Sequence, residues 1–245
     1  PRPNPHQVLV RVAACGFCHH DRSVMAGVLR RGITLNVVLG HEISGIVEET
    51  GSAVTSLRTG DHVVSILTEA CGRCDRCKTG REHRCHNGQG IGHGRDGGCA
   101  DYAVLTEQSL VRMPEGLDTV SSALLACPLG VALQAVQVTA KVKPGETVVV
   151  TGAGGGLGSH AVQAAASLGA NVLAVTSSPE KESALLGLGA AEVLVKSEMD
   201  FSELVMALTE DKGSDVVIDT VGSAVYPSTL KSLAQYGRLV FLGEI

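Results

Sequence analysis

The chain has 245 residues, 44% of them hydrophobic, and a formal net charge of −5 at pH 7. This length can bury one large or two modest cores without disulfide bonds, and the interspersed charges lack the basic face that a nucleic-acid partner requires. We find no run of about 18 apolar residues that could span a bilayer and no signal peptide in PRPNPHQ, so we expect a cytoplasmic protein without a membrane partner.

Residues 1–118 have the pattern of a β-rich domain. Short apolar segments alternate with glycine turns, which is typical of consecutive strands. The predicted strands span residues 8–14, 43–49, 61–67 and 100–105.

Residues 119–245 have a different pattern, in which β-branched runs alternate with stretches rich in alanine and leucine. This alternation predicts βαβ units and a parallel sheet. A helical connection is expected over 121–140. The predicted strands span residues 147–151, 172–176, 192–195, 216–220 and 238–242.

Four cysteines crowd into the segment CGRCDRCKTGREHRC, at Cys71, Cys74, Cys77 and Cys85. Four thiolates on one tight loop suit tetrahedral zinc, and a closed site of this kind is structural because no coordination position remains for substrate. Free or disulfide-bonded thiols and an iron–sulfur cluster are the alternatives.

A second group of metal-binding residues is split along the sequence. Cys18 in CGFCHHD and His41 in GHE offer one thiolate and one imidazole, and Cys127 in ALLACPLG is a candidate third ligand from the other wall of an interdomain cleft. Three protein ligands leave one position open for water or substrate, which is the catalytic arrangement.

These motifs, taken in order, resemble the zinc-containing medium-chain alcohol dehydrogenases. The resemblance implies an α/β protein with a GroES-like β-rich catalytic domain (1–118) and a Rossmann domain with a doubly wound parallel sheet (119–245). Family members continue beyond the last strand seen here, so we expect the chain to be incomplete at both ends. The resemblance also implies a homodimer or homotetramer.

The resemblance assigns roles around two zinc ions per chain. Cys18, His41 and Cys127 would hold the catalytic zinc, with Glu42 as a nearby carboxylate able to exchange with the water on the metal. Asp21 would orient the ring of His41 through its other nitrogen. The structural zinc would be bound by Cys71, Cys74, Cys77 and Cys85.

The position that commonly holds a proton-relaying Ser or Thr in the family is His20 in this chain. An imidazole titrates near neutrality, so His20 either relays a proton or contacts a cofactor phosphate, and His19 is a second candidate for phosphate. We expect His93 to be a candidate for the substrate entrance. Cys15 and Cys99 are expected to be buried thiols.

The segment VVVTGAGGGLGSHAVQAA runs from a strand through a glycine cluster into a helix, the context that favours a nucleotide-binding turn. Gly152 would allow the tight turn, Gly155 and Gly156 would let the backbone approach a pyrophosphate, and Gly158, after Leu157, would let the helix pack closely. The helix N-terminus supplies free N–H groups.

The end of the next strand, VLAVTSSPEK, lacks the acidic residue that usually binds the ribose of NAD. Thr176, Ser177 and Ser178 offer hydroxyls with Lys181 nearby, so NADP(H) is predicted over NAD(H). The resemblance places Val221 and Leu242 near the nicotinamide.

The predicted function is zinc-dependent hydride transfer between NADP(H) and a small-molecule alcohol, aldehyde or ketone. One alternative on the same fold is reduction of an activated C=C bond, in an enoyl thioester (acryloyl-CoA-like) or a quinone. A second alternative is a non-catalytic module that binds zinc and a nucleotide.

Overall fold

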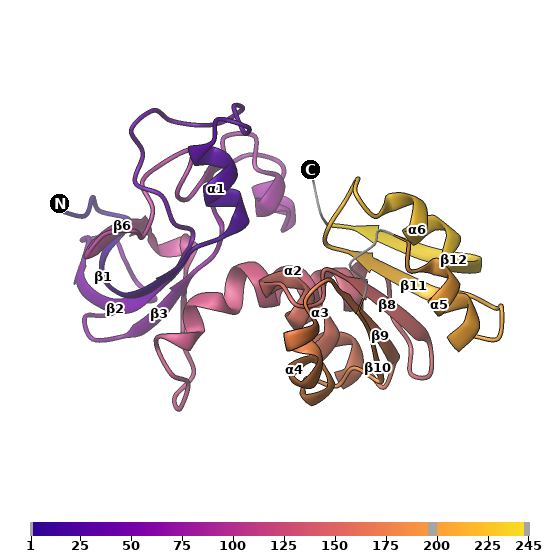
Figure 1. The fold of residues 1–245 in the computed structure, drawn as a ribbon. Coiled ribbons are helices and arrows are strands. Elements are labelled where there is room, and N and C mark those ends of the chain that lie inside the picture. The colour runs from indigo at the N-terminus through magenta and orange to yellow at the C-terminus, as the bar shows by residue number, and fades with distance from the viewer. Residues whose placement is uncertain (1, 196–199, 243–245) are drawn as a thin grey trace. The chain divides into compact units, whose positions relative to one another are not determined.

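The computed structural model describes residues 2–195 and 200–242. The chain forms two compact units, Pro1–Cys127 and Pro128–Ile245, which are described separately (Figure 1). Sequence analysis had placed the domain boundary after residue 118.

The first unit is built on a five-stranded antiparallel sheet in the order β6-β1-β2-β3-β7. All four strands predicted here are confirmed, and β7 adds a fifth. Alternate side chains of β1 point into the core, where Val8 and Val10 pack with Ile43 and Leu105. The strands are β1 (Gln7–Gly16), β2 (Glu42–Thr50), β3 (His62–Ser65), β6 (Tyr102–Thr106) and β7 (Leu110–Arg112).

Shorter elements complete the first unit. Helix α1 (His19–Met25) follows β1, and the two-residue strands β4 (Thr68–Glu69) and β5 (Gln89–Gly90) pair at the base of the four-cysteine segment. Glu69 accepts hydrogen bonds from the Arg95 guanidinium and from the backbone N–H of Thr106, so this base is tied to β6. Three 3₁₀ turns span Cys77–Thr79, Glu82–Arg84 and Glu107–Ser109.

The predicted helical connection is confirmed, but its winding is irregular. It consists of a 3₁₀ turn (Ser121–Leu124), a π turn (Leu125–Leu129), α2 (Gly130–Leu133) and a second π turn (Gln134–Thr139). The first segment packs against β1, β2 and β3. Pro128 within the first π turn has no N–H to donate, which fits a departure from regular α-helix at this point.

The same run corrects one expectation from the sequence. Ser121–Thr139, a run of 19 residues with a mean hydropathy of 1.5 in an 18-residue window, is long and apolar enough to cross a bilayer by length and composition. Serine, threonine and glutamine interrupt its apolar residues, so a search for an unbroken apolar run did not find it. Core helices of globular domains meet the same criterion, and Ala132, Ala135 and Val136 of this run pack in the core of the second unit.

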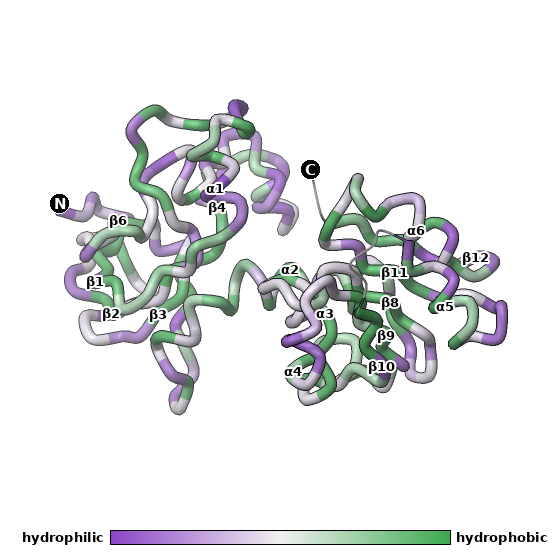
Figure 2. The backbone as a smooth tube through the Cα atoms, viewed as in Figure 1, coloured by the Kyte–Doolittle hydropathy of each residue, from purple (hydrophilic) through white to green (hydrophobic). Residues whose placement is uncertain are grey.

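The second unit is a five-stranded parallel sheet in the order β10-β9-β8-β11-β12. All five predicted strands are confirmed, and Figure 2 shows that the central ones are predominantly hydrophobic. The strands are β8 (Thr147–Thr151), β9 (Asn171–Thr176), β10 (Glu192–Val195), β11 (Ser214–Asp219) and β12 (Leu233–Phe241).

Helices cover both faces of this sheet (Figure 1). Val148 and Val150 point to the face covered by α2, α3 and α4, whereas Val149 points to the face covered by α5 and α6. This arrangement confirms the doubly wound parallel sheet. The helices are α3 (Gly156–Ser167), α4 (Glu182–Gly187), α5 (Ser202–Leu208) and α6 (Tyr226–Lys231), with a 3₁₀ turn at Pro179–Lys181.

Candidate active site

Four potential metal ligands converge in the first unit. Cys18, His41, Glu42 and Cys127 each offer a donor atom, and these atoms lie within 4.8 Å of one another. Cys18 caps the N-terminus of α1, His41 and Glu42 lead into β2, and Cys127 lies in the π turn. Two thiols, an imidazole and a carboxylate at this separation form a donor set that fits zinc.

All four donors belong to one unit, because Cys127 is the last residue of the first unit. Sequence analysis had assigned Cys127 to the second domain. The 3₁₀ turn Ser121–Leu124 packs on β1, β2 and β3, and this packing brings Cys127 Sγ to 4.0 Å from Cys18 Sγ.

Asp21 contacts the segments that carry Cys18 and His41. Its fully buried carboxylate accepts hydrogen bonds from the backbone N–H of Cys18 (2.9 Å) and of Gly40 (3.2 Å). The same carboxylate lies 3.4 Å from Nδ1 of His41, close enough for an ionic contact but without the geometry of a hydrogen bond. One side chain therefore positions the segments that carry two metal ligands.

The donor atoms also shift one another's protonation. The hydrogen bond from Cys127 lowers the pKa of Cys18 to about 3, and the same bond together with burial raises the pKa of Cys127. Burial lowers the pKa of His41, but the hydrogen bond to Cys18 and the charge of Asp21 outweigh it, so that the pKa is raised. Burial raises the pKa of Glu42. A metal ion binding here must therefore displace protons.

Two further histidines lie beside this donor set. Nε2 of His20 is 3.3 Å from Nδ1 of His93, and the ring of His20 also packs edge-on against that of His41, with centroids 5.4 Å apart. Burial lowers the pKa of His20 and of His93. His19, by contrast, is exposed on α1.

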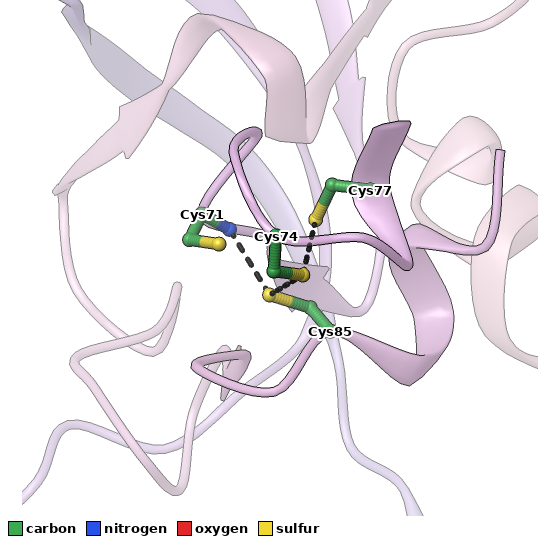
Figure 3. Close-up of side chains that lie close together, drawn as sticks. All are labelled: Cys71, Cys74, Cys77 and Cys85. Atoms are coloured by element: carbon green, nitrogen blue, oxygen red, sulfur yellow. Dashed lines mark hydrogen bonds between the residues drawn. The ribbon is translucent and has the colours of Figure 1, made fainter. Parts of the chain in front are cut away.

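The four-cysteine segment forms a second cluster (Figure 3). The Sγ atom of Cys74 is 3.5 Å from that of Cys77 and 3.9 Å from that of Cys85, and the four sulfur atoms lie within 4.8 Å of one another. Backbone N–H groups of Arg73 and Cys74 lower the pKa of Cys71 to about 6, whereas burial raises that of Cys77 to about 12. This donor set fits a closed tetrahedral zinc site.

The glycine turn of the second unit connects β8 to α3. Gly152 has a φ of +60°, and a Cβ on Gly158 would lie 2.3 Å from the carbonyl oxygen of Gly152, so neither position tolerates a side chain. A Cβ on Gly156 would meet nothing within 4 Å. Open space therefore lies over the first turn of α3, where free N–H groups can bind an anion.

Residues at the end of β9 border this turn. Lys181 donates a hydrogen bond from Nζ to the carbonyl oxygen of Gly154 (2.8 Å), and the buried Thr176 hydroxyl accepts one from the N–H of Ser178 (3.1 Å). Ser177 is exposed and Leu157 is half-buried in α3.

Two more predicted cofactor residues, Val221 and Leu242, follow the ends of β11 and β12. The carboxylate of Asp219, at the end of β11, accepts a hydrogen bond from the N–H of Val221 (2.9 Å), and its carbonyl accepts one from Leu242 (2.8 Å). Sequence analysis did not anticipate this role of Asp219, although the DTVG segment contains the signal of an acidic residue after a buried strand.

Two cysteines behave differently from expectation. Cys99 is exposed and Cys15 is half-buried, so neither is the buried thiol that the sequence suggested. Burial raises the pKa of Cys15 to about 12. The pairing of His20 with His93 was also missed, and the only signal for it was the glycine-rich GIGHGRDGG segment around His93.

Replacing Asp21 by asparagine should lower zinc affinity at the Cys18 donor set about 10- to 100-fold, the usual effect of losing an outer partner of a metal ligand. Asparagine keeps the size of the side chain but has one fewer acceptor oxygen and no negative charge. A competitive chelator titration would measure the change, with Asp61→Asn, at an aspartate that accepts a hydrogen bond from the backbone N–H of Arg58, as the matched control. Equal affinities in the two variants would refute the role of Asp21.

Comparisons with known proteins agree with this architecture. Family models match residues 4–115 (alcohol dehydrogenase GroES-like domain) and residues 156–244 (zinc-binding dehydrogenase). An acryloyl-coenzyme A reductase of Metallosphaera sedula is 38% identical over 245 residues, covering all of this chain and 71% of that protein. An NAD-dependent alcohol dehydrogenase of Saccharolobus solfataricus is 36% identical, covering 99% of this chain and 72% of that protein.

A solved structure adds cofactor information. A zinc-binding dehydrogenase of Sinorhizobium meliloti was solved with NADP bound. Its structure superimposes on this chain with a TM-score of 0.90 at 34% identity, and the match covers all of this chain and 71% of that one. The two matched domains, their order along the chain and the identity over its full length all indicate the same family. The chain therefore belongs to the medium-chain dehydrogenase/reductase family and is an oxidoreductase that acts on a small-molecule substrate.

Proposed function

We propose that this protein transfers hydride between NADP(H) and an alcohol, aldehyde or ketone with the help of zinc. The observation that carries the proposal is the donor set Cys18, His41, Glu42 and Cys127, gathered in one unit and supported by the buried Asp21. A second zinc, at the four-cysteine cluster, would have a structural role.

Zinc, when bound, supplies a Lewis acid that stabilises negative charge on a substrate oxygen. Cys18, His41 and Cys127 would hold the metal, and Glu42 would offer a further carboxylate donor beside them. Asp21 links the segment before α1 to the segment that leads into β2, because its carboxylate accepts hydrogen bonds from the backbone N–H groups of Cys18 and Gly40.

His20 accepts the proton of an alcohol substrate and passes it to His93. Nε2 of His20 and Nδ1 of His93 are 3.3 Å apart, so one ring can donate while the other accepts. The lowered pKa of both residues favours the neutral imidazoles that can accept a proton near neutral pH.

The preference for NADP(H) rests on the residues after β9. The end of β9 carries Thr176, Ser177 and Ser178 where an NAD enzyme usually has an acidic residue. The ammonium group of Lys181 is hydrogen-bonded to the carbonyl oxygen of Gly154 in the glycine turn. Hydroxyls and one positive charge favour a 2′-phosphate, which an acidic residue would repel. The glycine turn and the N-terminus of α3 would take the pyrophosphate, and Val221 and Leu242 would lie near the nicotinamide. His19 is a further candidate for phosphate.

Changing Lys181 to alanine should weaken NADPH binding about tenfold or more and leave NADH binding unchanged, because one charge-assisted hydrogen bond contributes about 1.5 to 3 kcal/mol. Nicotinamide fluorescence titrations with both cofactors would test this. Lys212→Ala, another exposed lysine of the same unit, serves as the control. Equal losses for NADPH and NADH would refute the phosphate role.

A second candidate reaction is reduction of an enoyl thioester, favoured by the 38% identity to an acryloyl-coenzyme A reductase. The deciding experiment follows NADPH oxidation with a panel of aldehydes and with enoyl thioesters, and identifies the products. Alcohol as the product supports the main proposal, and a saturated thioester alone supports the second. Turnover of neither class would contradict both and favour a non-catalytic module.

Three further expectations accompany this proposal. We keep a cytoplasmic location, a homodimer or homotetramer, and a domain boundary after residue 118 as predictions. Light scattering of the purified protein would test the oligomeric state.

A further inference from the structure

Two cysteines outside the metal donor sets lie side by side in the first unit. Sγ of Cys15, on β1, is 3.9 Å from Sγ of Cys99, in the segment before β6, although the residues are 84 positions apart. All eight cysteines lie in the described part of the chain, and the other six belong to the two donor sets. The Cys15–Cys99 pair is therefore left as a free dithiol when both donor sets bind zinc.

The pair packs against the backbone that carries the metal ligands. A Cβ on Gly40 would lie 2.4 Å from the sulfur of Cys15 and 2.7 Å from that of Cys99, so the two sulfurs share the space that the missing side chain leaves. Gly40, with a φ of +94°, directly precedes His41, and its N–H is held by Asp21.

Backbone hydrogen bonds connect Cys99 to this segment, and strand pairing connects Cys15 to it. The N–H of Cys99 donates to Leu39 and that of Gly98 to Gly40, both at 2.9 Å. On the other side, Cys15 is the register partner of Ile43 on β2, one residue after Glu42. Residues 39–43, which include His41 and Glu42, are thus held between the two cysteines.

We propose that Cys15 and Cys99 are a site of reversible oxidation, at which a hydroperoxide forms a disulfide that weakens zinc binding at the neighbouring donor set. The part that concerns zinc rests on the proposed function. Cys99 reacts first because it is exposed, whereas Cys15 is half-buried.

The chemistry balances with one peroxide per disulfide. With hydrogen peroxide as the hydroperoxide, the sulfur of Cys99 attacks one peroxide oxygen, the O–O bond breaks, and the products are Cys99 sulfenic acid and water. The sulfur of Cys15 then attacks the sulfur of Cys99, an S–S bond replaces the S–O bond, and the departing hydroxide leaves with the Cys15 proton as a second water. Two thiols lose two electrons, and the peroxide gains them.

Closing the bridge must disturb the metal ligands. The sulfur atoms have to approach from 3.9 Å to about 2 Å. Cys99 is hydrogen-bonded through its backbone to the segment that holds His41 and Glu42, and Cys15 is paired with the same segment across β1 and β2. Zinc ligand distances tolerate only about 0.2 Å of change, so a small shift of this segment lowers affinity.

The test uses the full chain loaded with zinc and treated with one equivalent of hydrogen peroxide. Non-reducing digestion and mass spectrometry should find a peptide pair joined through Cys15 and Cys99. Chelator titration should show affinity at the Cys18 donor set lowered about 10- to 100-fold, the range for a displaced outer partner, and a thiol reductant should restore it. The matched variant, Cys99→Ser, should retain its affinity after the same treatment.

Cys99 is exposed, so its replacement should not impair folding, and Cys15→Ser provides a second variant. Absence of the Cys15–Cys99 linkage would overturn the proposal, as would a linkage that leaves zinc affinity unchanged. An untreated chain that binds zinc only at the four-cysteine cluster would instead contradict the proposed function, and it would also overturn the zinc part of this inference.

Discussion

Turnover should fall about a thousandfold when Cys18 is replaced by alanine, while NADPH binding stays unchanged. A Lewis acid contributes several kcal/mol to stabilising charge on substrate oxygen, and about 4 kcal/mol corresponds to three powers of ten in rate. Cys18 supplies one of the two thiols of the donor set and lies 4.0 Å from the other, so its loss leaves Cys127 without a thiolate partner at the metal.

Three measurements make this prediction specific. Elemental analysis should find one zinc fewer per chain, nicotinamide fluorescence should show unchanged NADPH affinity, and steady-state assays should show the loss of turnover. Cys99→Ser, a replacement of a cysteine outside both donor sets, is the control and should keep both zinc ions and full activity under reducing conditions. Normal turnover by Cys18→Ala would refute the catalytic role of the metal.

Replacing Cys85 by serine should unfold the four-cysteine segment and leave the rest of the first unit intact. Zinc binding to such sites contributes about 10 to 16 kcal/mol in small peptides, and only Cys77 is buried among the four cysteines, so little apolar packing would remain to hold the segment. The hydroxyl of serine is a poor substitute for a thiolate ligand.

Limited digestion with trypsin would detect this local unfolding, because the segment contains several cleavage sites. These sites are Arg73, Arg76, Lys78, Arg81 and Arg84. Cleavage should occur there in Cys85→Ser and be much slower in the unmodified protein and in Cys99→Ser. A variant that loses one zinc ion and yet remains protected would show that the fold of this segment does not depend on a structural metal.

The sequence alone predicted the local features of this protein. The spacing of Cys71, Cys74, Cys77 and Cys85 predicted one cluster, because a chain of so few residues cannot carry its thiols far apart. The change of hydrophobic pattern predicted a β-rich domain followed by a parallel sheet, since the period and residue type of a strand depend on how its faces are buried. The glycine turn was also predictable, because Gly152 has a positive φ and a Cβ on Gly158 would clash with the backbone of the turn, so both positions require glycine.

Contacts between distant parts of the chain were decided by the tertiary structure. His20 meets His93 across 73 positions, and Cys15 meets Cys99 across 84. Cys127 reaches Cys18 across 109 positions and belongs to the first unit, because a 3₁₀ turn packs on three strands and a π turn follows it. Such contacts depend on how sheets, turns and helices pack, and side-chain packing between distant segments leaves no periodic signal in the sequence.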